Sequence, residues 1–194
     1  MNIRPPAAEP GLDRTDPRFA RLKEIIGERS LMRGAFTLAS GRSSTYLFQL
    51  RQTTMDPEGS CLLSEIVATF MRTAGLSHIG GLEMGAVPIV SAVAATSFRL
   101  GHPVSAFFVR KKPKDHGARQ QIDGYVPKGG EALIVDDVTT TGGSTLKAVE
   151  AVRDQCTVRT ALSIVDREEG ATENLAAAGI RLLPLFRRSD FGIA

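Results

Sequence analysis

The sequence predicts an α/β fold in which a mostly parallel central sheet is flanked by helices and carries a small N-terminal hood. From about residue 78 onward, short apolar runs alternate with longer segments in which apolar residues recur at helical spacing. Such alternation is typical of parallel strands joined by helices that cover the sheet. Residues 36–50 break the alternation, and we expect them to pack over the carboxyl ends of the strands.

The first two helices begin at the same signal. Asp16 and Asp56 are each followed by a proline, which suits an N-cap and the first helical position. Gly75 marks the end of the second helix. The apolar faces of the two helices are formed by Phe19, Leu22, Ile25 and Ile26, and by Leu62, Leu63, Ile66, Val67, Phe70 and Met71.

The rest of the chain supplies the alternating elements. Two of its three helical patterns are followed by a glycine, Gly101 and Gly179, the residue that most readily adopts a helix C-cap conformation. We expect strands at residues 78–82, 104–109, 132–136, 160–165 and 180–185, and helices at residues 88–100, 143–154 and 172–178.

The bulk composition is that of an ordinary globular protein. The 194 residues suit one domain with a sizeable core, and 42% of them are hydrophobic and 23% charged. A net charge of +3 is too small to argue for nucleic acid as a partner. The prolines near the N-terminus predict a disordered tail over residues 1–15. Residues 16–194 then form a single domain, with the hood mainly at 16–55 and the core at about 56–194.

Cysteine usage and hydropathy bear on the compartment. Cys61 and Cys156 do not form a Cys-x-x-Cys pair, so we expect neither a disulfide framework nor a zinc site, and we predict a reducing, cytoplasmic location. The chain contains no apolar stretch long enough to span a bilayer. Its first residues also lack the apolar core of a signal peptide, so we expect no association with a membrane.

Residues 132–145 contain the strongest functional signal. An apolar run ends in Asp136 and Asp137, and the sequence Val-Thr-Thr-Thr-Gly-Gly-Ser follows before a helical pattern begins. Ligands of parallel α/β sheets bind where strands end and helices begin. Backbone N–H groups, small hydroxyls and a helix N-terminus suit a phosphate, while the carboxylates suit sugar hydroxyls or a hydrated cation. The pattern therefore predicts a site for a phosphorylated sugar.

Other interpretations of this segment are weaker. The chain has neither the Gly-x-x-x-x-Gly-Lys-Ser/Thr motif of a P-loop nor the Gly-x-Gly-x-x-Gly motif of dinucleotide folds. Without a P-loop, the two aspartates do not make a convincing Walker B strand. An ordinary strand, turn and helix is the plainest alternative, but the paired aspartates followed by three threonines favour the phosphosugar site.

A basic segment follows the strand expected at 104–109. Residues 110–119 contain six basic side chains, and Pro113 and Gly117 oppose regular structure there. Such a run is often only a solvated loop, and a basic patch can also bind nucleic acid, although aromatic side chains are not interleaved here. Positioned after a buried strand, these cations would stabilise the negative charge that develops on a pyrophosphate leaving group.

Four segments resemble the orotate phosphoribosyltransferases of the type I phosphoribosyltransferase superfamily. The Asp-Asp segment is similar to the superfamily's signature for phosphoribosyl pyrophosphate. Residues 34–46, 110–117 and 165–170 resemble, in order and rough spacing, the family's N-terminal segment, mobile catalytic loop and late orotate-binding turn. The resemblance covers nearly everything from about Asp16 to the C-terminus. It implies the type I phosphoribosyltransferase fold and, in pyrimidine biosynthesis, transfer of ribose 5-phosphate to orotate, giving orotidine 5′-monophosphate and diphosphate.

The resemblance also implies roles for individual residues. Lys114, Asp136 and Asp137 would be catalytic, and Thr140 and Arg167 would contact orotate. Mg²⁺ is the implied cofactor, held through substrate and water near the two aspartates rather than by direct protein ligands. Phosphoribosyl pyrophosphate would be bound by Arg110, Lys111, Lys114, His116, Asp136, Asp137, Val138, Thr139, Thr140, Thr141, Gly142, Gly143 and Ser144.

The family pattern further implies a homodimer in which the loop at residues 110–121 is shared across subunits. Three positions depart from the commoner pattern, because Ala39 stands where many members have lysine, Gly85 where some have a basic residue and Leu47 where some have an aromatic residue. Tyr46 and Phe48 are candidates for an aromatic wall beside the base, with core packing equally open for Phe48.

Two other functions remain open on the sequence. A purine phosphoribosyltransferase shares the Asp-Asp segment, but such enzymes usually lack segments like residues 36–41 and 114–117. A non-catalytic regulator that senses phosphoribosyl pyrophosphate and binds nucleic acid would need a DNA-binding helix pair or a larger basic face, and the short N-terminal region offers neither. From the length of 194 residues we expect no fused decarboxylase domain.

Overall fold

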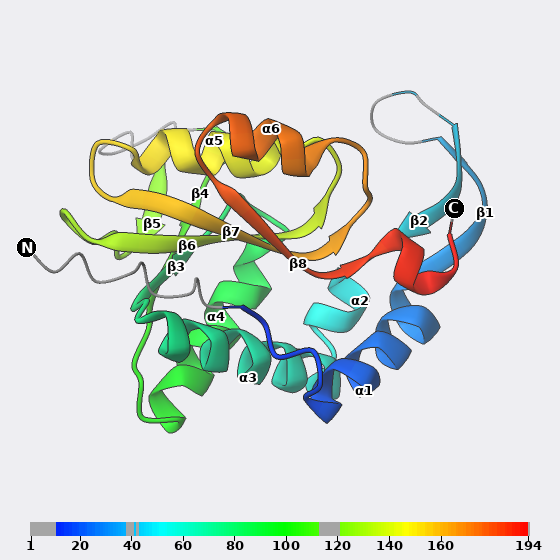
Figure 1. Cartoon of the computed structure of the whole chain (residues 1–194), viewed down its shortest axis with the longest axis horizontal. Helices are drawn as coiled ribbons and strands as arrows, with labels where there is room; N and C mark the ends of the chain where they lie inside the picture. The colour runs from blue at the N-terminus through cyan, green and yellow to red at the C-terminus, as the bar shows by residue number, and fades with distance from the viewer. Residues whose placement is uncertain (1–10, 38–40, 42, 113–120, 194) are drawn as a thin grey trace, which may run out of the picture.

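The computed structural model describes residues 11–37, 41, 43–112 and 121–193. Its centre is a six-stranded sheet with the strand order β5-β4-β3-β6-β7-β8 (Figure 1). The edge strand β5 (Ile122–Gly124) is antiparallel to β4. The remaining strands pair in parallel, which confirms the predicted mostly parallel sheet. They are β3 (His78–Gly80), β4 (Ser105–Val109), β6 (Glu131–Thr139), β7 (Thr157–Asp166) and β8 (Arg181–Arg187).

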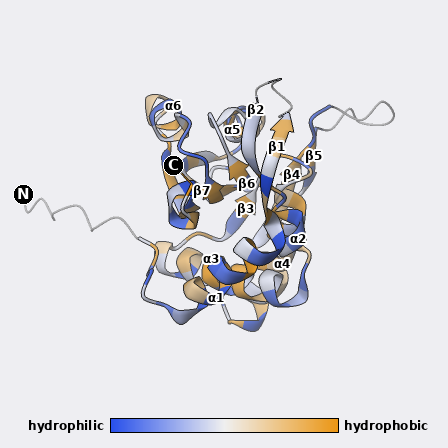
Figure 2. Cartoon of the chain, turned by 90° about the vertical axis from the view of Figure 1, so that its right-hand side faces the viewer, coloured by the Kyte–Doolittle hydropathy of each residue, from blue (hydrophilic) through white to orange (hydrophobic). Residues whose placement is uncertain are grey.

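Helices cover both faces of this sheet (Figure 1). On one face lie α5 (Gly143–Val152) and α6 (Ala171–Ala177), and on the other α3 (Pro57–Ala74) packs on α4 (Ala86–Arg99). The largest apolar cluster lies between the sheet and the α3–α4 pair, and smaller clusters lie under α5 and α6. Figure 2 colours the same cartoon by hydropathy, and both the central strands and the helices beneath them carry hydrophobic segments. Within the described part of the chain, no helix has both the length and the apolar character needed to cross a membrane.

Most predicted elements are present, with shifted ends. Strand β3 is shorter than the predicted range, since only Leu82 pairs beyond it, in a single bridge to Val109. Strand β6 runs beyond Asp136, because Val138 and Thr139 continue the pairing with β7. The prediction did not include β5, α2 (Arg51–Thr54), the π-helical turn η1 (Ile26–Ser30) or the 3₁₀ turn η2 (Arg188–Phe191).

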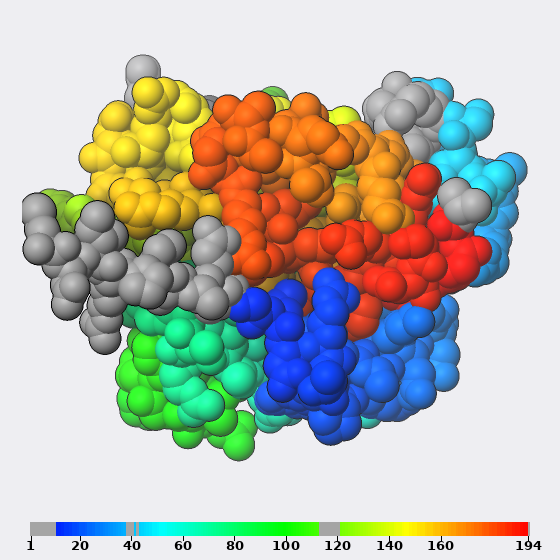
Figure 3. Space-filling view, viewed as in Figure 1, coloured from blue at the N-terminus to red at the C-terminus, as the bar shows by residue number. Residues whose placement is uncertain are grey.

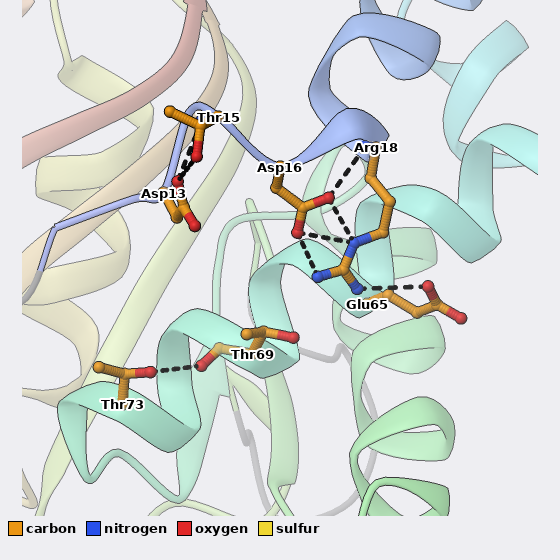
Figure 4. Close-up of polar contacts among 7 residues, drawn as sticks. All are labelled: Asp13, Thr15, Asp16, Arg18, Glu65, Thr69 and Thr73. Atoms are coloured by element: carbon orange, nitrogen blue, oxygen red, sulfur yellow. Dashed lines mark hydrogen bonds and ion pairs between the residues drawn. The ribbon is translucent and has the colours of Figure 1, made fainter.

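The helix starts follow the predicted capping. Asp16 accepts a hydrogen bond from the Arg18 backbone N–H at 2.9 Å before α1 (Pro17–Ile25), and Asp56 caps α3 through the N–H of Gly59 at 2.9 Å. The Arg18 guanidinium also joins Asp16, at 2.5 Å, to Glu65 of α3, at 3.3 Å (Figure 4). An ion pair therefore reinforces the apolar packing of α1 on α3.

The hood is built around a β-hairpin. Strands β1 (Leu31–Thr37) and β2 (Ser43–Phe48) form a separate antiparallel sheet. The guanidinium of Arg167, which follows β7 directly, lies 4.5 Å from the ring centre of Tyr46 in β2. The hairpin therefore covers the carboxyl end of β7, as predicted. In contrast, α1 and α2 pack beside α3, so only the hairpin part of the hood reaches the strand ends (Figure 1).

The first described residues contradict part of the predicted disordered tail. The Arg14 side chain donates hydrogen bonds to the carbonyls of Leu185 (2.9 Å) and Pro184 (2.7 Å) in the edge strand β8. Figure 3 shows this segment against the C-terminal part of the chain. The prediction is therefore wrong for residues 11–15, because a guanidinium satisfies exposed carbonyls of a sheet edge. Residues 1–10 lie outside the described residues.

The Asp56 cap generates a stability prediction. Asp56→Ala removes the acceptor for the Gly59 N–H and the ion pair with Arg29, and we expect a loss of about 1 kcal/mol in the free energy of unfolding, measured by urea titration. Asp154→Ala, an exposed acid just beyond α5, is the matched control and should change stability by less than about 0.5 kcal/mol. Equal losses in both variants would contradict the capping role.

Candidate functional site

The two aspartates of the phosphosugar motif lie at the carboxyl end of β6. Asp136 is only 8% exposed, whereas Asp137 is half-buried. The backbone N–H of Asp137 donates to Asp136 Oδ1 at 3.1 Å, and that of Val138 donates to Asp137 Oδ1 at 2.9 Å. The local backbone thus holds both carboxylates at the edge of the sheet where the ligands of parallel sheets bind.

Burial dominates the electrostatics of this pair. It raises the pKa of Asp136 from its ordinary value to about 8, and the neighbouring negative charge of Asp137 raises it further, while Lys111 acts in the opposite direction. The pair therefore retains a proton near neutral pH in the ligand-free protein. A cation or a hydrogen-bond donor brought by a ligand would favour the ionised form.

Gly85 explains one departure from the family pattern. A Cβ atom at this position would lie 2.3 Å from Asp137 Oδ1, far inside van der Waals contact. The Asp137 carboxylate thus occupies the space beside a bare backbone, and a long basic side chain at Gly85 would have to displace it. Ala39, another departure, lies outside the described residues.

The predicted phosphate loop connects β6 to α5. Thr141, Gly143 and Ser144 are exposed, and α5 begins at Gly143, so its first N–H groups are available to an anion. Gly142 has a φ of +82°, and a Cβ there would lie 3.1 Å from the side chain of Leu175, so glycine is required on both grounds. The Asn174 side-chain amide fixes the loop by donating to the Thr141 carbonyl at 2.9 Å.

Thr139 does not contribute its hydroxyl to that loop. Because β6 continues through this residue, its side chain is buried and donates a hydrogen bond to Ser163 Oγ at 2.7 Å. The predicted contact between Thr139 and phosphoribosyl pyrophosphate stays a prediction, and in this structure the Thr139 hydroxyl is already engaged by Ser163. Val138 and Thr140 are half-buried beside it and remain at the strand end.

The start of the basic segment faces the phosphate loop. Arg110, Lys111 and Ser144 line one cavity of about 1030 Å³. The Arg110 guanidinium also lies 2.5 Å from the Asp123 carboxylate of β5, an element that the sequence analysis did not predict. Lys114 and His116 belong to residues 113–120, outside the described residues, so their predicted contacts stay predictions.

Arg167 lies in a second cavity, of about 630 Å³, beneath the hairpin. Its side chain is 7% exposed, its Nε lies 2.8 Å from Glu169 Oε1, and one Nη donates to Ser44 Oγ at 3.4 Å. Its backbone N–H donates to the Thr139 carbonyl at 2.9 Å, which joins this cavity to the phosphosugar motif. The simple alternative of a solvated surface arginine is therefore wrong, although the pairing with Glu169 is present.

The two aromatic candidates for the base site lie in different surroundings. Tyr46 lines the cavity of Arg167, whereas Phe48 belongs to the main apolar cluster and packs edge-on against Phe191 at 5.3 Å. Sequence reasoning missed Arg188, which follows β8 and lines the same cavity as Arg167. Only the tertiary fold brings these two arginines together, so no local sequence signal indicates it.

The carboxylate oxygens at the end of β6 suit Mg²⁺, but they do not make a complete set of metal ligands. Among the described residues, no group of three or more His, Cys, Asp or Glu side chains is arranged to hold a metal ion. Asp136 and Asp137 offer hard oxygen donors, and Mg²⁺ commonly combines one or two carboxylates with water and substrate phosphates.

Comparison with known proteins agrees with this geometry. Residues 62–178 match the family model of the phosphoribosyl transferase domain. Over 177 residues, 89% of this chain and 95% of the relative, the sequence is 51% identical to the orotate phosphoribosyltransferase of Rhodopseudomonas palustris (strain TIE-1). The chain belongs to the orotate phosphoribosyltransferase family. The family member of Aquifex aeolicus is 40% identical over 88% of this chain and 95% of its own length.

Structural similarity extends over the same region. The orotate phosphoribosyltransferase of Mycobacterium tuberculosis H37Rv, solved in complex with 5-phospho-alpha-D-ribosyl 1-diphosphate, has a TM-score of 0.77 to this chain. The two sequences are 34% identical, and the match covers 91% of this chain and 100% of the other. The predicted type I phosphoribosyltransferase fold is thereby confirmed.

The burial of Asp136 generates a prediction about pH. Because the folded-state pKa is raised above the unfolded value of 3.8, the native protein binds the extra proton, and stability should fall as pH rises from about 4 to about 8. Asp136→Asn should remove that fall and be more stable by about 1 kcal/mol or more at pH 8. Urea titrations across this range measure the slope, with Asp154→Asn as an exposed control. Parallel curves for wild type and Asp136→Asn would refute the assignment.

Proposed function

We propose that this protein transfers the ribose 5-phosphate unit of phosphoribosyl pyrophosphate to N1 of orotate. The C1–O bond to diphosphate breaks, a bond from C1 to N1 forms, and the N1 proton is released, giving orotidine 5′-monophosphate and diphosphate in pyrimidine biosynthesis. The observation that carries the proposal is the placement of the buried Arg167 one strand away from the Asp136–Asp137 pair, with its N–H on the Thr139 carbonyl.

The phosphosugar occupies the edge of β6 in this proposal. The exposed N–H groups and hydroxyls of residues 141–144 bind the 5′-phosphate, and the two aspartates bind the ribose hydroxyls. The carboxylates also balance the positive charge that develops at C1 as diphosphate leaves. Lys111, together with Lys114 and His116 outside the described residues, stabilises the departing diphosphate. Catalysis then rests on positioning and on electrostatic stabilisation rather than on a strong general base.

Mg²⁺ is proposed as the cofactor. When bound, it neutralises the diphosphate and ribose oxygens and retains part of its water shell. Asp136 and Asp137 are the residues that would hold it, through water and substrate. Their adjacent positions at the strand end support this, because a divalent cation would offset the repulsion between the two carboxylates and favour the ionised form of Asp136.

The base occupies the cavity beneath the hairpin. Orotate is a planar anion, and a guanidinium provides fixed charge and paired N–H donors for its carboxylate. Tyr46 supports the guanidinium of Arg167 from one side, and Thr140 lies at the strand end between the base and the sugar. This arrangement supports an anionic pyrimidine rather than a purine.

A homodimer and a cytoplasmic location complete the proposal. Residues 110–112 extend from β4 toward the segment that, by resemblance, is shared with a neighbouring subunit. The free cysteines support a reducing compartment, since Cys61 is exposed and Cys156 is buried without a disulfide partner.

A substrate panel tests the reaction. Purified protein with phosphoribosyl pyrophosphate and Mg²⁺ is offered orotate, uracil, adenine, hypoxanthine, guanine or nicotinate, and nucleotide formation is followed. We expect turnover with orotate only, and its loss when EDTA removes the metal. Turnover with a purine would overturn the base assignment, and binding of phosphoribosyl pyrophosphate without any turnover would favour a regulator.

Arg167 is the sharpest single test of the base site. We expect Arg167→Ala to raise the orotate KM by about 100-fold, because a charge-assisted contact is worth on the order of 2–3 kcal/mol. The KM for phosphoribosyl pyrophosphate should change far less. Arg159→Ala, at an exposed arginine of β7, the strand that Arg167 follows, is the control. An orotate KM equal to that of wild type would remove Arg167 from the base site.

A further inference from the structure

A second arginine shares the cavity of Arg167. Arg188 begins the turn η2, immediately after the edge strand β8, and lines the cavity of about 630 Å³ together with Tyr46 and Arg167. Because β7 and β8 are parallel neighbours, the residues that follow them emerge at the same end of the sheet. Two arginines from adjacent strand ends therefore line one open cavity.

The cavity is built to hold Arg188 in place. Glu168 Oε2 lies 3.6 Å from Arg188 Nε, and the same carboxylate accepts hydrogen bonds from the backbone N–H (3.1 Å) and hydroxyl (3.2 Å) of Ser189. Glu168 itself has a φ of +57°, a conformation that a non-glycine residue adopts only when its surroundings hold it. One carboxylate thus ties the turn after β7 to the turn after β8.

Two buried polar atoms beside this cavity lack a well-formed hydrogen bond. The Tyr46 hydroxyl and Arg188 Nε are buried, and neither makes a hydrogen bond of good geometry among the described residues. The hydroxyl is nevertheless close enough to be the largest cause of the raised pKa of Arg188. Buried polar atoms in native proteins are normally satisfied, so these two atoms leave hydrogen-bonding capacity that a polar ligand in the cavity can use.

The two arginines of the cavity differ in the strength of their ion pairs. Glu169 pairs with Arg167 at 2.8 Å, and Glu168 lies at the longer distance of 3.6 Å from Arg188. Of the two arginines, Arg188 is the one with the weaker ion pair and the more exposed side chain, 29% against 7%. It can therefore turn toward a ligand at a smaller cost than Arg167.

We propose that Arg188 is a second binding residue for the base and sets the preference for a carboxylated pyrimidine over an uncharged one. This inference rests on the proposed function. Arg167, held between Tyr46, Ser44 and Glu169, gives one fixed cation, and Arg188 supplies a second donor fork to the carboxylate or to an adjacent carbonyl oxygen. A pyrimidine without the carboxylate would make no charge-assisted contact with either guanidinium, and each would keep only its carboxylate partner, Glu169 or Glu168.

The test compares Arg188→Gln, Arg188→Lys and the neighbouring control Arg187→Gln. Arg187 is exposed and lines a different cavity, beside Asp166. Steady-state kinetics give kcat and the separate KM values for orotate and phosphoribosyl pyrophosphate, and turnover of uracil is followed at high concentration. Thermal unfolding of each variant accompanies the kinetics.

We expect Arg188→Gln to raise the orotate KM about tenfold, with the KM for phosphoribosyl pyrophosphate within twofold of wild type. The ratio of orotate to uracil efficiency should fall by the same factor. Arg188→Lys keeps the charge but not the paired N–H donors, so its orotate KM should lie between those of wild type and Arg188→Gln. The control Arg187→Gln should match wild type. Because the lysine variant retains a cation facing Glu168, it keeps the test usable if the glutamine variant folds poorly.

Three results would overturn the role of Arg188. They are an orotate KM within twofold of wild type in Arg188→Gln, equal rises in both KM values, or the same effect in Arg187→Gln. In each case, turnover of orotate by the wild-type protein leaves the proposed function standing. If the wild type turns over no orotate, the proposed function itself fails and the inference falls with it.

Discussion

The buried carboxylate of Asp136 is the constraint on which the site depends. Removing an ionised group from water is costly, and a second carboxylate beside it adds repulsion. The position of Asp136 is fixed because β6 pairs with β3 at Leu133 and Ile134 and continues to pair with β7 through Asp136 to Thr139. The cost is reduced by a retained proton and would be offset on binding of a cationic or hydrogen-bonding ligand. The folded protein therefore tolerates the two adjacent aspartates without a ligand, and their carboxyl oxygens remain able to bind one.

The parallel sheet converts distant sequence segments into one ligand-binding edge. The two aspartates follow β6, Arg167 follows β7 and Arg188 follows β8, so adjacent strands deliver the sugar site and the base site in spatial order. The hairpin adds what the sheet cannot supply, an aromatic ring beneath the guanidinium of Arg167. Function thus arises from side chains placed by strand order rather than by sequence proximity.

Much of this arrangement was predictable, for identifiable physical reasons. Asp16 and Asp56 act locally, through caps that bond to N–H groups two or three residues away, so local sequence suffices. The continuation of β6 to Thr139 and the short strand β5 were missed because strand pairing, not local preference, creates them. Arg188 was missed for the same reason, since only the register of β7 and β8 brings it beside Arg167.

The residues at which the basic segment begins are fixed by hydrogen bonds that extend the sheet beyond the end of β3. In one of these bonds a side-chain carboxylate accepts in place of a backbone carbonyl. Beyond the end of β3, the Val109 N–H donates to the Gly81 carbonyl at 2.8 Å and the Glu83 N–H donates to the Val109 carbonyl at 2.9 Å. The next N–H, that of Lys111, donates to the Glu83 carboxylate at 2.8 Å. On the other side, the Arg110 N–H donates to the Gln121 carbonyl at 2.8 Å. The cations that face the phosphate loop therefore leave from a fixed point, so the position of their backbone is determined before any ligand arrives.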